Sequence, residues 1–271
     1  METKIPFATA SEFLQYSLAN ADCLPGEEQK FLKHYYRSWG DFSSDRMRHW
    51  YDFQLRDIER LLKEKVAPKL LDAGCGTGTE SLWFALNGAD VTAIDIDDHL
   101  LAVANARRTF LIEQELELAS CRFKKQKILD ATGTYDFIWL EQAFHHMEPR
   151  EDVVAKLADL LAPEGYILFC ETNAWTPLLQ YQFYRLRKFK FIIRHQGEIW
   201  GNERVLTPGR LAKHMAGAGL SVEHRNYFRI FPSGERFDRM LSFEKTVEQA
   251  GLSIVAPFLF THYGLVAQKP A

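Results

Sequence analysis

The 271-residue sequence has few cysteines, no long apolar run and no excess charge of one sign. The four cysteines are scattered without a C-x-x-C pair, which argues against a disulfide framework or a cysteine zinc site and favours a reducing cytoplasm. No apolar run reaches the length of a membrane span, and the start METKIPFATASEF lacks a signal-peptide core. The net charge of -3 gives no general attraction to nucleic acid or anionic membranes. We therefore expect a cytoplasmic globular protein.

The pattern of apolar residues predicts an α/β fold. Residues 27–66 carry apolar side chains at three- and four-residue spacings, which is typical of helices. From residue 69 onwards, short apolar runs alternate with helical segments, and this alternation predicts a parallel sheet covered by helices on both faces. The predicted strands are 69–74, 90–97, 121–129, 135–141 and 165–171, and the predicted helices between them are 79–89, 98–112 and 150–161.

The alternation is interrupted after residue 171 by a segment rich in aromatic and basic side chains. Thr207 and Pro208 then predict the start of a helix, as its N-cap and its first-turn proline. A strand, a helix and a closing strand are predicted at 221–231, 234–251 and 256–269. Seven strands in this order predict one domain with an insertion, not two domains.

A glycine-rich turn, KLLDAGCGTGTE, follows the first predicted strand. Gly74, Gly76 and Gly78 lack a Cβ, so the backbone can turn sharply and a ligand can approach its N–H groups. The helix that opens near Thr79 would add its positive end. A dinucleotide fingerprint, G-x-G-x-x-G, would place the third glycine at position 79, where the sequence has Thr79. The spacing therefore argues against a nicotinamide cofactor.

This motif and its surroundings resemble the class I S-adenosylmethionine-dependent methyltransferases, in particular the small-molecule group near the ubiquinone-type enzymes. Three more segments carry the resemblance, VTAIDID, ILDAT and YDFIWLEQAFHHMEP, so that it covers about residues 66–172 firmly and the rest loosely. The resemblance implies one Rossmann-like α/β domain whose seven-stranded sheet is mostly parallel with an antiparallel last strand, with a helical cap. The expected parts are an N-terminal helical lid at 1–66, the cofactor-binding core at 67–172, an acceptor insertion at 173–206 and the C-terminal completion of the sheet at 207–271.

The resemblance also implies where S-adenosylmethionine and its product S-adenosylhomocysteine would bind. Asp95 would accept hydrogen bonds from both ribose hydroxyls, although an acidic residue there could instead cap the next helix. Asp130 would meet the adenine amino group with the backbone of Ala131 beside it, or belong to an ordinary turn. The expected cofactor-binding residues are Asp72, Gly74, Cys75, Gly76, Gly78, Asp95, Ile96, Asp130, Ala131, Glu141 and Tyr36.

Tyr36 is included because the N-terminal helices are rich in aromatic residues. Members of the family that this sequence resembles often use such a segment as a lid over the cofactor. Aromatic residues at helical spacing, however, more often belong to the hydrophobic core. A buried phenol hydroxyl needs a hydrogen-bond partner, which favours Tyr36 or Tyr35 reaching the cofactor.

Methyl transfer is an in-line displacement, which gains from alignment of the acceptor and exclusion of water. A base is needed only where the acceptor must lose a proton. The candidates are His145, His146 and Glu141, at the carboxyl end of the fourth predicted strand, where open α/β sheets bind ligands. Alternatively His146 fixes its loop by hydrogen bonding, and Glu141 organises the backbone around the methionine amino group.

The segment RLRKFKFIIRH, residues 185–195, interleaves basic and apolar side chains. The simplest interpretation is an amphipathic helix with its basic side in water; the alternatives are contact with an anionic lipid surface or with an acceptor that has an anionic group and an apolar body. No nucleic-acid partner is expected. The loop after the fourth predicted strand reads EQAFHH and lacks the NPPY-like sequence that base-amino methyltransferases carry there. No metal site is expected. The candidate acceptor-binding residues are Trp39, Trp175, Tyr181, Tyr184 and Arg185.

The sequence therefore predicts an S-adenosylmethionine-dependent methyltransferase that acts on a small or lipid-like molecule, with oxygen slightly favoured over nitrogen or carbon as the acceptor atom. Two alternatives stay open. One is a cofactor-binding subunit or sensor without catalysis, and the other is a nicotinamide-dependent reductase.

Overall fold

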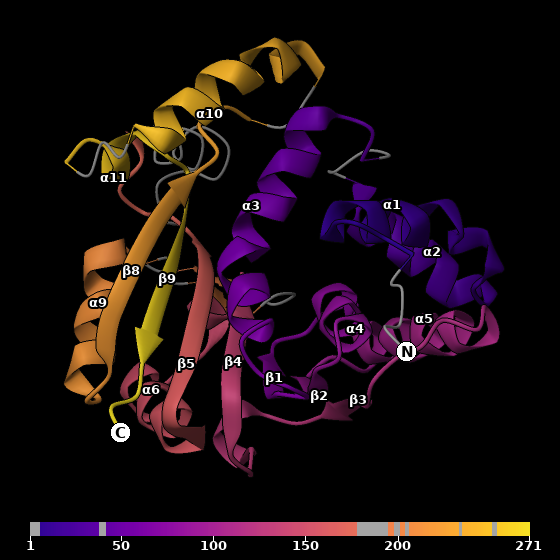
Figure 1. Ribbon diagram of the computed structural model, residues 1–271, viewed down its shortest axis with the longest axis horizontal. Coiled ribbons are helices and arrows are strands. Elements are labelled where there is room, and N and C mark those ends of the chain that lie inside the picture. The colour runs from indigo at the N-terminus through magenta and orange to yellow at the C-terminus, as the bar shows by residue number, and fades with distance from the viewer. Residues whose placement is uncertain are drawn as a thin grey trace. The chain divides into compact units, whose positions relative to one another are not determined.

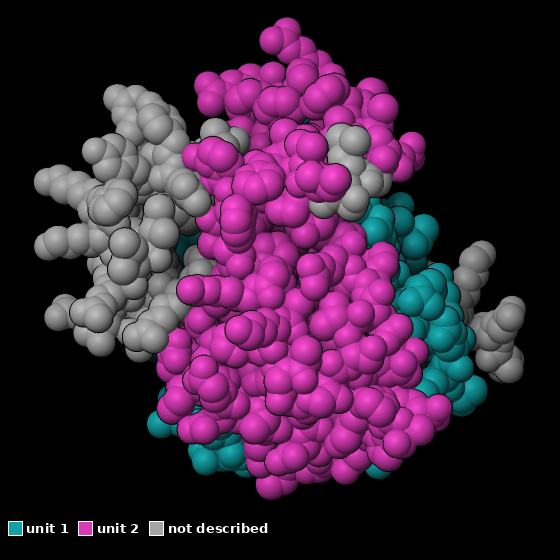
Figure 2. Space-filling view, turned by 90° about the vertical axis from the view of Figure 1, so that its left-hand side faces the viewer, with its two compact units in different colours: residues 1–131 teal, residues 132–271 magenta. Residues whose placement is uncertain are grey.

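The computed structural model describes residues 6–37, 42–177, 195–197, 201–203, 206–232, 235–250 and 254–271. The chain divides into two compact units, residues 1–131 and residues 132–271 (Figure 2). The predicted division into lid, core, insertion and C-terminal part stays a prediction. Within the described ranges, no helix combines the length and the apolar character needed to cross a membrane.

The first unit holds the N-terminal helices and three parallel strands (Figure 1). Its elements are α1 (Ala10–Ala19), α2 (Gly26–Tyr35), α3 (Asp45–Leu62), β1 (Lys69–Ala73), α4 (Thr79–Leu86), β2 (Asp90–Asp95), α5 (Asp98–Glu113), β3 (Cys121–Lys125) and a short helical turn, Ile128–Asp130. β1 pairs with β2 from Lys69 opposite Asp90, and β2 pairs with β3 from Val91 opposite Cys121. The helical and strand segments predicted between residues 27 and 129 are confirmed, except that the third strand ends at Lys125.

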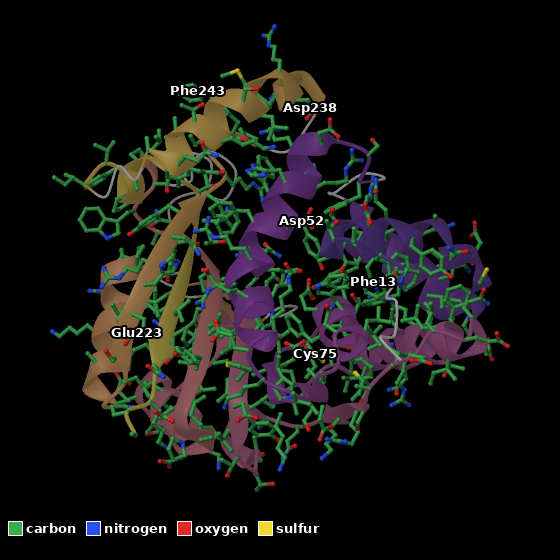
Figure 3. The ribbon with its side chains drawn as sticks, in the orientation of Figure 1. Phe13, Asp52, Cys75, Glu223, Asp238 and Phe243 are labelled. Atoms are coloured by element: carbon green, nitrogen blue, oxygen red, sulfur yellow. The ribbon has the colours of Figure 1, made fainter. Side chains whose placement is uncertain are left out.

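The N-terminal helices pack on the helices that cover these strands. Phe13 of α1 stacks on Trp83 of α4, with ring centroids 5.9 Å apart. Asp52 of α3, which is labelled in Figure 3, accepts hydrogen bonds from the backbone N–H and the hydroxyl of Ser11, each at 2.8 Å. The indole N–H of Trp83 donates to Glu59 at 2.8 Å. These contacts join α1 and α3 to the layer that carries the glycine turn.

Helix α1 lies within the predicted helical lid at 1–66, but its bounds were not predicted. Its start is nevertheless readable in the stretch TASE, a Thr-x-x-Glu pattern of the kind that opens helices. The Thr9 hydroxyl accepts a hydrogen bond from the backbone N–H of Glu12, and the Glu12 carboxylate accepts one from the N–H of Ala8. The sequence signal for this helix is therefore its N-cap, and not a long periodic pattern of apolar residues.

The second unit holds the remaining strands of the sheet. Its elements are β4 (Tyr135–Glu141), a helical turn at Phe144–His146, α6 (Arg150–Leu160), β5 (Leu161–Thr172), β6 (His195–Gly197), β7 (Gly201–Glu203), α9 (Pro208–Gly217), β8 (Ser221–Phe228), a helical turn at Glu235–Met240, α10 (Leu241–Gln249), α11 (Ala256–Leu259) and β9 (His262–Gln268). β4 and β5 are parallel, and β9 is antiparallel to both β5 and β8. As predicted, Thr207 caps α9 and accepts a hydrogen bond from the N–H of Arg210.

The closing strand is shorter than predicted. The expected strand 256–269 begins only at His262, because Ala256–Leu259 forms a helical turn in which the N–H of Phe260 donates to the carbonyl of Ala256. Pro257 explains the difference. β9 lies between β5 and β8, and a proline inside a central strand has no N–H for the ladder.

The seven long strands form one sheet in the order β3-β2-β1-β4-β5-β9-β8. β9 is the one antiparallel strand, inserted between β5 and β8. A mostly parallel seven-stranded sheet whose last strand is antiparallel was expected, so the sheet confirms the predicted fold class. The short pair β6-β7 forms a separate two-stranded ribbon.

Candidate functional site

The glycine turn follows β1 and leads into α4. Gly74, Gly76 and Gly78 all have positive φ, at 85°, 55° and 74°. A Cβ on Gly78 would lie 2.7 Å from the Phe123 ring and 2.8 Å from the Cβ of Ala104, and one on Gly76 would lie 3.1 Å from the Tyr35 hydroxyl. The backbone conformation and the lack of space both require glycine at position 78.

The carboxylate of Asp95 is tied to this turn. Its Oδ2 accepts the backbone N–H of Gly76 at 2.9 Å, and its Oδ1 accepts the N–H groups of Ile96 and Asp97 at 2.7 and 3.0 Å. The cap of α5 is a different residue, because the Asp97 carboxylate accepts the N–H of His99 at 2.8 Å. Asp95 is therefore not the helix cap, and within the described chain Oδ2 accepts one hydrogen bond and keeps room for a second.

The residues expected around the adenine differ in exposure. Ile96 directly follows Asp95 and is 66% exposed, an unusual exposure for a large apolar side chain. Asp130 is exposed at the end of its helical turn, and its backbone carbonyl accepts from Gln126 at 2.7 Å. The N–H of Ala131 donates to the carbonyl of Ile128 at 3.1 Å, so this N–H is already engaged. The adenine contacts stay a prediction.

Asp72 is buried at the end of β1, where its Oδ2 accepts the hydroxyl of Ser81 at 2.5 Å. Burial raises the pKa of Asp72 to about 8, and the negative charges of Glu80 and Asp95 act in the same direction. Burial also raises the pKa of the neighbouring Cys75 thiol well above its usual range. The end of β1 therefore holds a mostly neutral carboxyl at pH 7.

Tyr36 is buried, but its hydroxyl reaches the start of α4. It lies 2.6 Å from the hydroxyl of Thr79 and 3.4 Å from that of Thr77. Burial raises the pKa of Tyr36 to about 12, so the phenol stays protonated. Tyr35, in contrast, is 39% exposed, and its hydroxyl lies beside Gly76.

Two charged residues of this region were not predicted. Arg107 of α5 is buried and donates from Nη1 to the Thr77 carbonyl at 2.8 Å and to the Thr79 hydroxyl at 2.6 Å. Glu80 accepts the Tyr51 hydroxyl at 2.5 Å, and burial raises the pKa of Glu80. A signal for Arg107 exists, because it continues the helical spacing of the buried residues Leu100, Val103, Ala104 and Leu111.

In the second unit, His145 lies in the loop after β4 and is held by a carboxylate. Its Nδ1 lies 2.7 Å from Oε2 of Glu171, whose Oε1 accepts the backbone N–H of Phe144 at 2.9 Å. Both side chains are buried, and the ring of His146 lies 4.1 Å from that of His145 between centroids. His146 is half-buried. The structure therefore distinguishes a histidine locked to β5 from one that is more exposed.

Glu171 was not predicted as a site residue, although it ended the predicted strand 165–171. A charged residue at the carboxyl end of a parallel strand is a signal for a site, since ligands of open α/β sheets bind there. Glu141 ends β4 and is half-buried. The next residue, Gln142, has φ 48° and donates its N–H to the carbonyl of Cys170 at 2.8 Å.

Of the candidate acceptor residues, the structure describes only Trp175. Its side chain is 46% exposed and packs edge-on against Phe258, with ring centroids 5.1 Å apart. Trp39, Tyr181, Tyr184 and Arg185 lie outside the described residues, as do the side chains of the segment 185–195. Among the described residues, no group of three or more histidine, cysteine or acidic side chains could hold a metal ion.

Residues 42–230 match the model of a methyltransferase domain family. The chain belongs to this family. Over 128 residues it is 31% identical to a ribosomal RNA small subunit methyltransferase C of Chromohalobacter salexigens, which covers 45% of this chain and 37% of that protein. Over 106 residues it is 31% identical to a ubiquinone biosynthesis O-methyltransferase of Shewanella pealeana, covering 39% and 44%. The chain thus spans less than half the length of these curated relatives.

A solved structure with the same fold is the magnesium protoporphyrin IX methyltransferase of Synechocystis with bound S-adenosylhomocysteine. The TM-score is 0.56 at 13% identity, covering 96% of this chain and 99% of that one. Membership of the methyltransferase family confirms the predicted recognition, and the solved structure shares the predicted fold. Membership of a methyltransferase family argues, as the glycine spacing does, against a nicotinamide-dependent reductase.

Proposed function

We propose that this methyltransferase transfers the methyl group of S-adenosylmethionine to an oxygen atom of a small or lipid-like molecule. The observation that carries the cofactor part is the bond between the N–H of Gly76 and the Asp95 carboxylate, 2.9 Å long, at the point where two adjacent strands end. A turn of three glycines with positive φ, held to a carboxylate with a remaining acceptor position, fits an adenosine cofactor with ribose hydroxyls and a charged amino acid end.

Each residue of this first unit would have a separate task. Asp95 would accept hydrogen bonds from the ribose, and the exposed side chain of Ile96 would cover one face of the adenine. Asp72, whose pKa is about 8, would give up its proton when a positive amino group comes near. The bound cofactor supplies a methyl group on a sulfonium, which leaves as a neutral thioether.

The preference for oxygen rests on the histidines of the second unit. Because Nδ1 of His145 faces the Glu171 carboxylate, the proton belongs on Nδ1, and the other ring nitrogen is the acceptor. His146 is the more exposed of the two rings and remains our candidate for the base that takes the hydroxyl proton. An alcohol or phenol needs such a base more than an amine does, and the ubiquinone relative is named for O-methylation.

The acceptor is proposed to have an anionic group and an apolar body. The support is the composition of residues 185–195, where basic and apolar side chains interleave. Nucleic acid is not proposed, although one relative is named for ribosomal RNA, because the match covers 37% of that relative and the present chain is acidic overall.

The first test is a calorimetric titration of the purified chain with S-adenosylmethionine, S-adenosylhomocysteine and NADH in parallel. We expect micromolar binding of the first two and none of the third. A panel of phenols, hydroxy acids, acyl carboxylates, amines and acidic carbon compounds is then screened for formation of S-adenosylhomocysteine. Tight cofactor binding without turnover on any acceptor class, oxygen, nitrogen or carbon, would favour the non-catalytic alternative.

A further inference from the structure

The residue between Gly76 and Gly78 is held from outside the turn. The N–H of Gly76 donates to Asp95, and the N–H of Gly78 donates to the carbonyl of Cys75, both at 2.9 Å. The carbonyl of Thr77 accepts from Nη1 of Arg107 at 2.8 Å. The Thr77 carbonyl and the Gly78 N–H belong to one peptide unit, so Arg107 and the Cys75 carbonyl fix its direction together, whereas glycine on either side would leave the backbone free to rotate.

Arg107 reaches the turn from the middle of α5 and is only 3% exposed. The same Nη1 atom lies 2.6 Å from the hydroxyl of Thr79, the first residue of α4, and 3.3 Å from the hydroxyl of Thr77. Both threonines are fully buried. One nitrogen therefore bridges the glycine turn and the start of the following helix.

A buried arginine is costly at this position. Among the described residues, its Nε and Nη2 atoms have no hydrogen-bond partner. Burial raises the pKa of the Glu80 carboxyl, and the positive charge of Arg107 acts against this effect. An apolar side chain of similar length would fill the space without unpaired donors. What the arginine adds is its hydrogen bonds to Thr77 and Thr79.

Tyr36, from the N-terminal helices, contacts the same Thr79 hydroxyl as Arg107. Arginine can only donate, so the Thr79 oxygen accepts from Arg107 and shares a second hydrogen bond with the Tyr36 hydroxyl at 2.6 Å. Tyr36 directly follows α2, which lies beside α5 (Figure 1). The contact at Thr79 thus joins α2, α5 and the glycine turn within one unit.

We propose that Arg107 is a positioning residue for S-adenosylmethionine, which holds the Thr77 peptide so that the turn presents its backbone to the methionine end of the cofactor. Tyr36 supports it through Thr79. This inference rests on the proposed cofactor site and adds to it a residue that touches no part of the cofactor. Its effect is confined to the turn, so it distinguishes ligands with the amino acid end from ligands without it.

The test compares Arg107→Met with Arg108→Met. Arg108 is the next residue of α5 and donates to the carbonyl of Cys121 on β3 at 2.8 Å, so it is a matched arginine-to-carbonyl contact away from the turn. Affinities for S-adenosylhomocysteine and for 5′-methylthioadenosine, which lacks the amino acid end, are measured by calorimetry. The fold of each ligand-free variant is checked by thermal unfolding.

We expect Arg107→Met to weaken S-adenosylhomocysteine binding about tenfold to a hundredfold, and methylthioadenosine binding by less than about threefold. Arg107→Lys, which keeps the charge and one donor position, should recover part of the loss. Arg108→Met should leave both affinities within about twofold. Equal weakening of both ligands by Arg107→Met would mean a general structural role and would overturn the proposal.

Two further variants keep the test decisive if Arg107→Met does not fold. Thr79→Val removes the oxygen that Arg107 and Tyr36 share, and should weaken S-adenosylhomocysteine binding several-fold. Adding Tyr36→Phe to it should then cost little more, because both changes break one contact. Unchanged S-adenosylhomocysteine affinity in Thr79→Val, or equal weakening of both ligands by it, would overturn the inference alone, whereas a wild-type protein that binds neither adenosine ligand would overturn the proposed function.

Discussion

The glycine turn after β1 and the loop after β4 achieve rigidity in different ways. In the turn, the backbone N–H of Gly76 is held by the Asp95 carboxylate, and glycine is required because a Cβ on Gly78 would lie 2.7 Å from Phe123. In the loop, a side chain is held by another side chain, as the His145 ring is by Glu171 at 2.7 Å. A turn built from backbone leaves a motif in the sequence, whereas a loop built from paired side chains leaves scattered residues.

The largest expected effect lies in the loop. His146→Ala should lower turnover on the true acceptor by about two to four orders of magnitude if this ring takes the acceptor proton, and should leave cofactor affinity unchanged. Steady-state kinetics and calorimetry on the same sample measure both. Unaffected turnover would make His146 structural and would remove the chemical contrast between the two regions.

The next effect concerns the backbone of the turn. Gly78→Ala should lower the free energy of unfolding by about 3 kcal/mol, since it adds a steric clash to a left-handed backbone conformation. Gly88→Ala is the control, because Gly88 also has positive φ, at 88°, but a Cβ there meets open space. We expect the control to lower the free energy of unfolding by about 1 kcal/mol, and urea unfolding measures both variants. Equal losses would show that the close contact at Gly78 relaxes freely.

Asp95→Asn should weaken S-adenosylhomocysteine binding about tenfold, because the ribose hydroxyls and the N–H of Gly76 lose a charged acceptor. Asp97→Asn is the matched control two residues away, since asparagine caps a helix as well as aspartate. The pair of titrations separates the ribose role from general damage to this loop. The same affinity in both variants would refute the role of Asp95.

The smallest effect is the pH dependence of stability that comes from Asp72. Its folded pKa of about 8 lies above the unfolded value, so its favourable contribution is complete below about pH 4 and is lost as the pH rises through about 8. Between pH 7 and pH 8 the free energy of unfolding of the wild-type protein without ligand should fall by about 1 kcal/mol more than that of the Asp72→Asn variant. Urea unfolding at the two pH values measures this, and parallel curves would contradict the raised pKa.

Most of the fold could be predicted from the sequence, and the exceptions have local causes. β4 has the predicted bounds, and Thr207 caps the helix expected there. The closing strand was predicted too early, because the aromatic run around Pro257 resembles a strand until its place in the middle of the sheet is known. Apolar periodicity reports burial, but not the hydrogen bond that each residue must make inside the sheet.

The sequence by itself determined the fold class and the family, because glycines with positive φ and a carboxylate after the next strand leave a local pattern of fixed spacing. The tertiary structure alone decided the partners of Arg107 and His145. Each lies at least 26 positions along the chain from its hydrogen-bond partner. Such pairs form because side chains pack together and because a buried charge needs a partner. Neither the packing nor the partner can be predicted from the identity of a single residue.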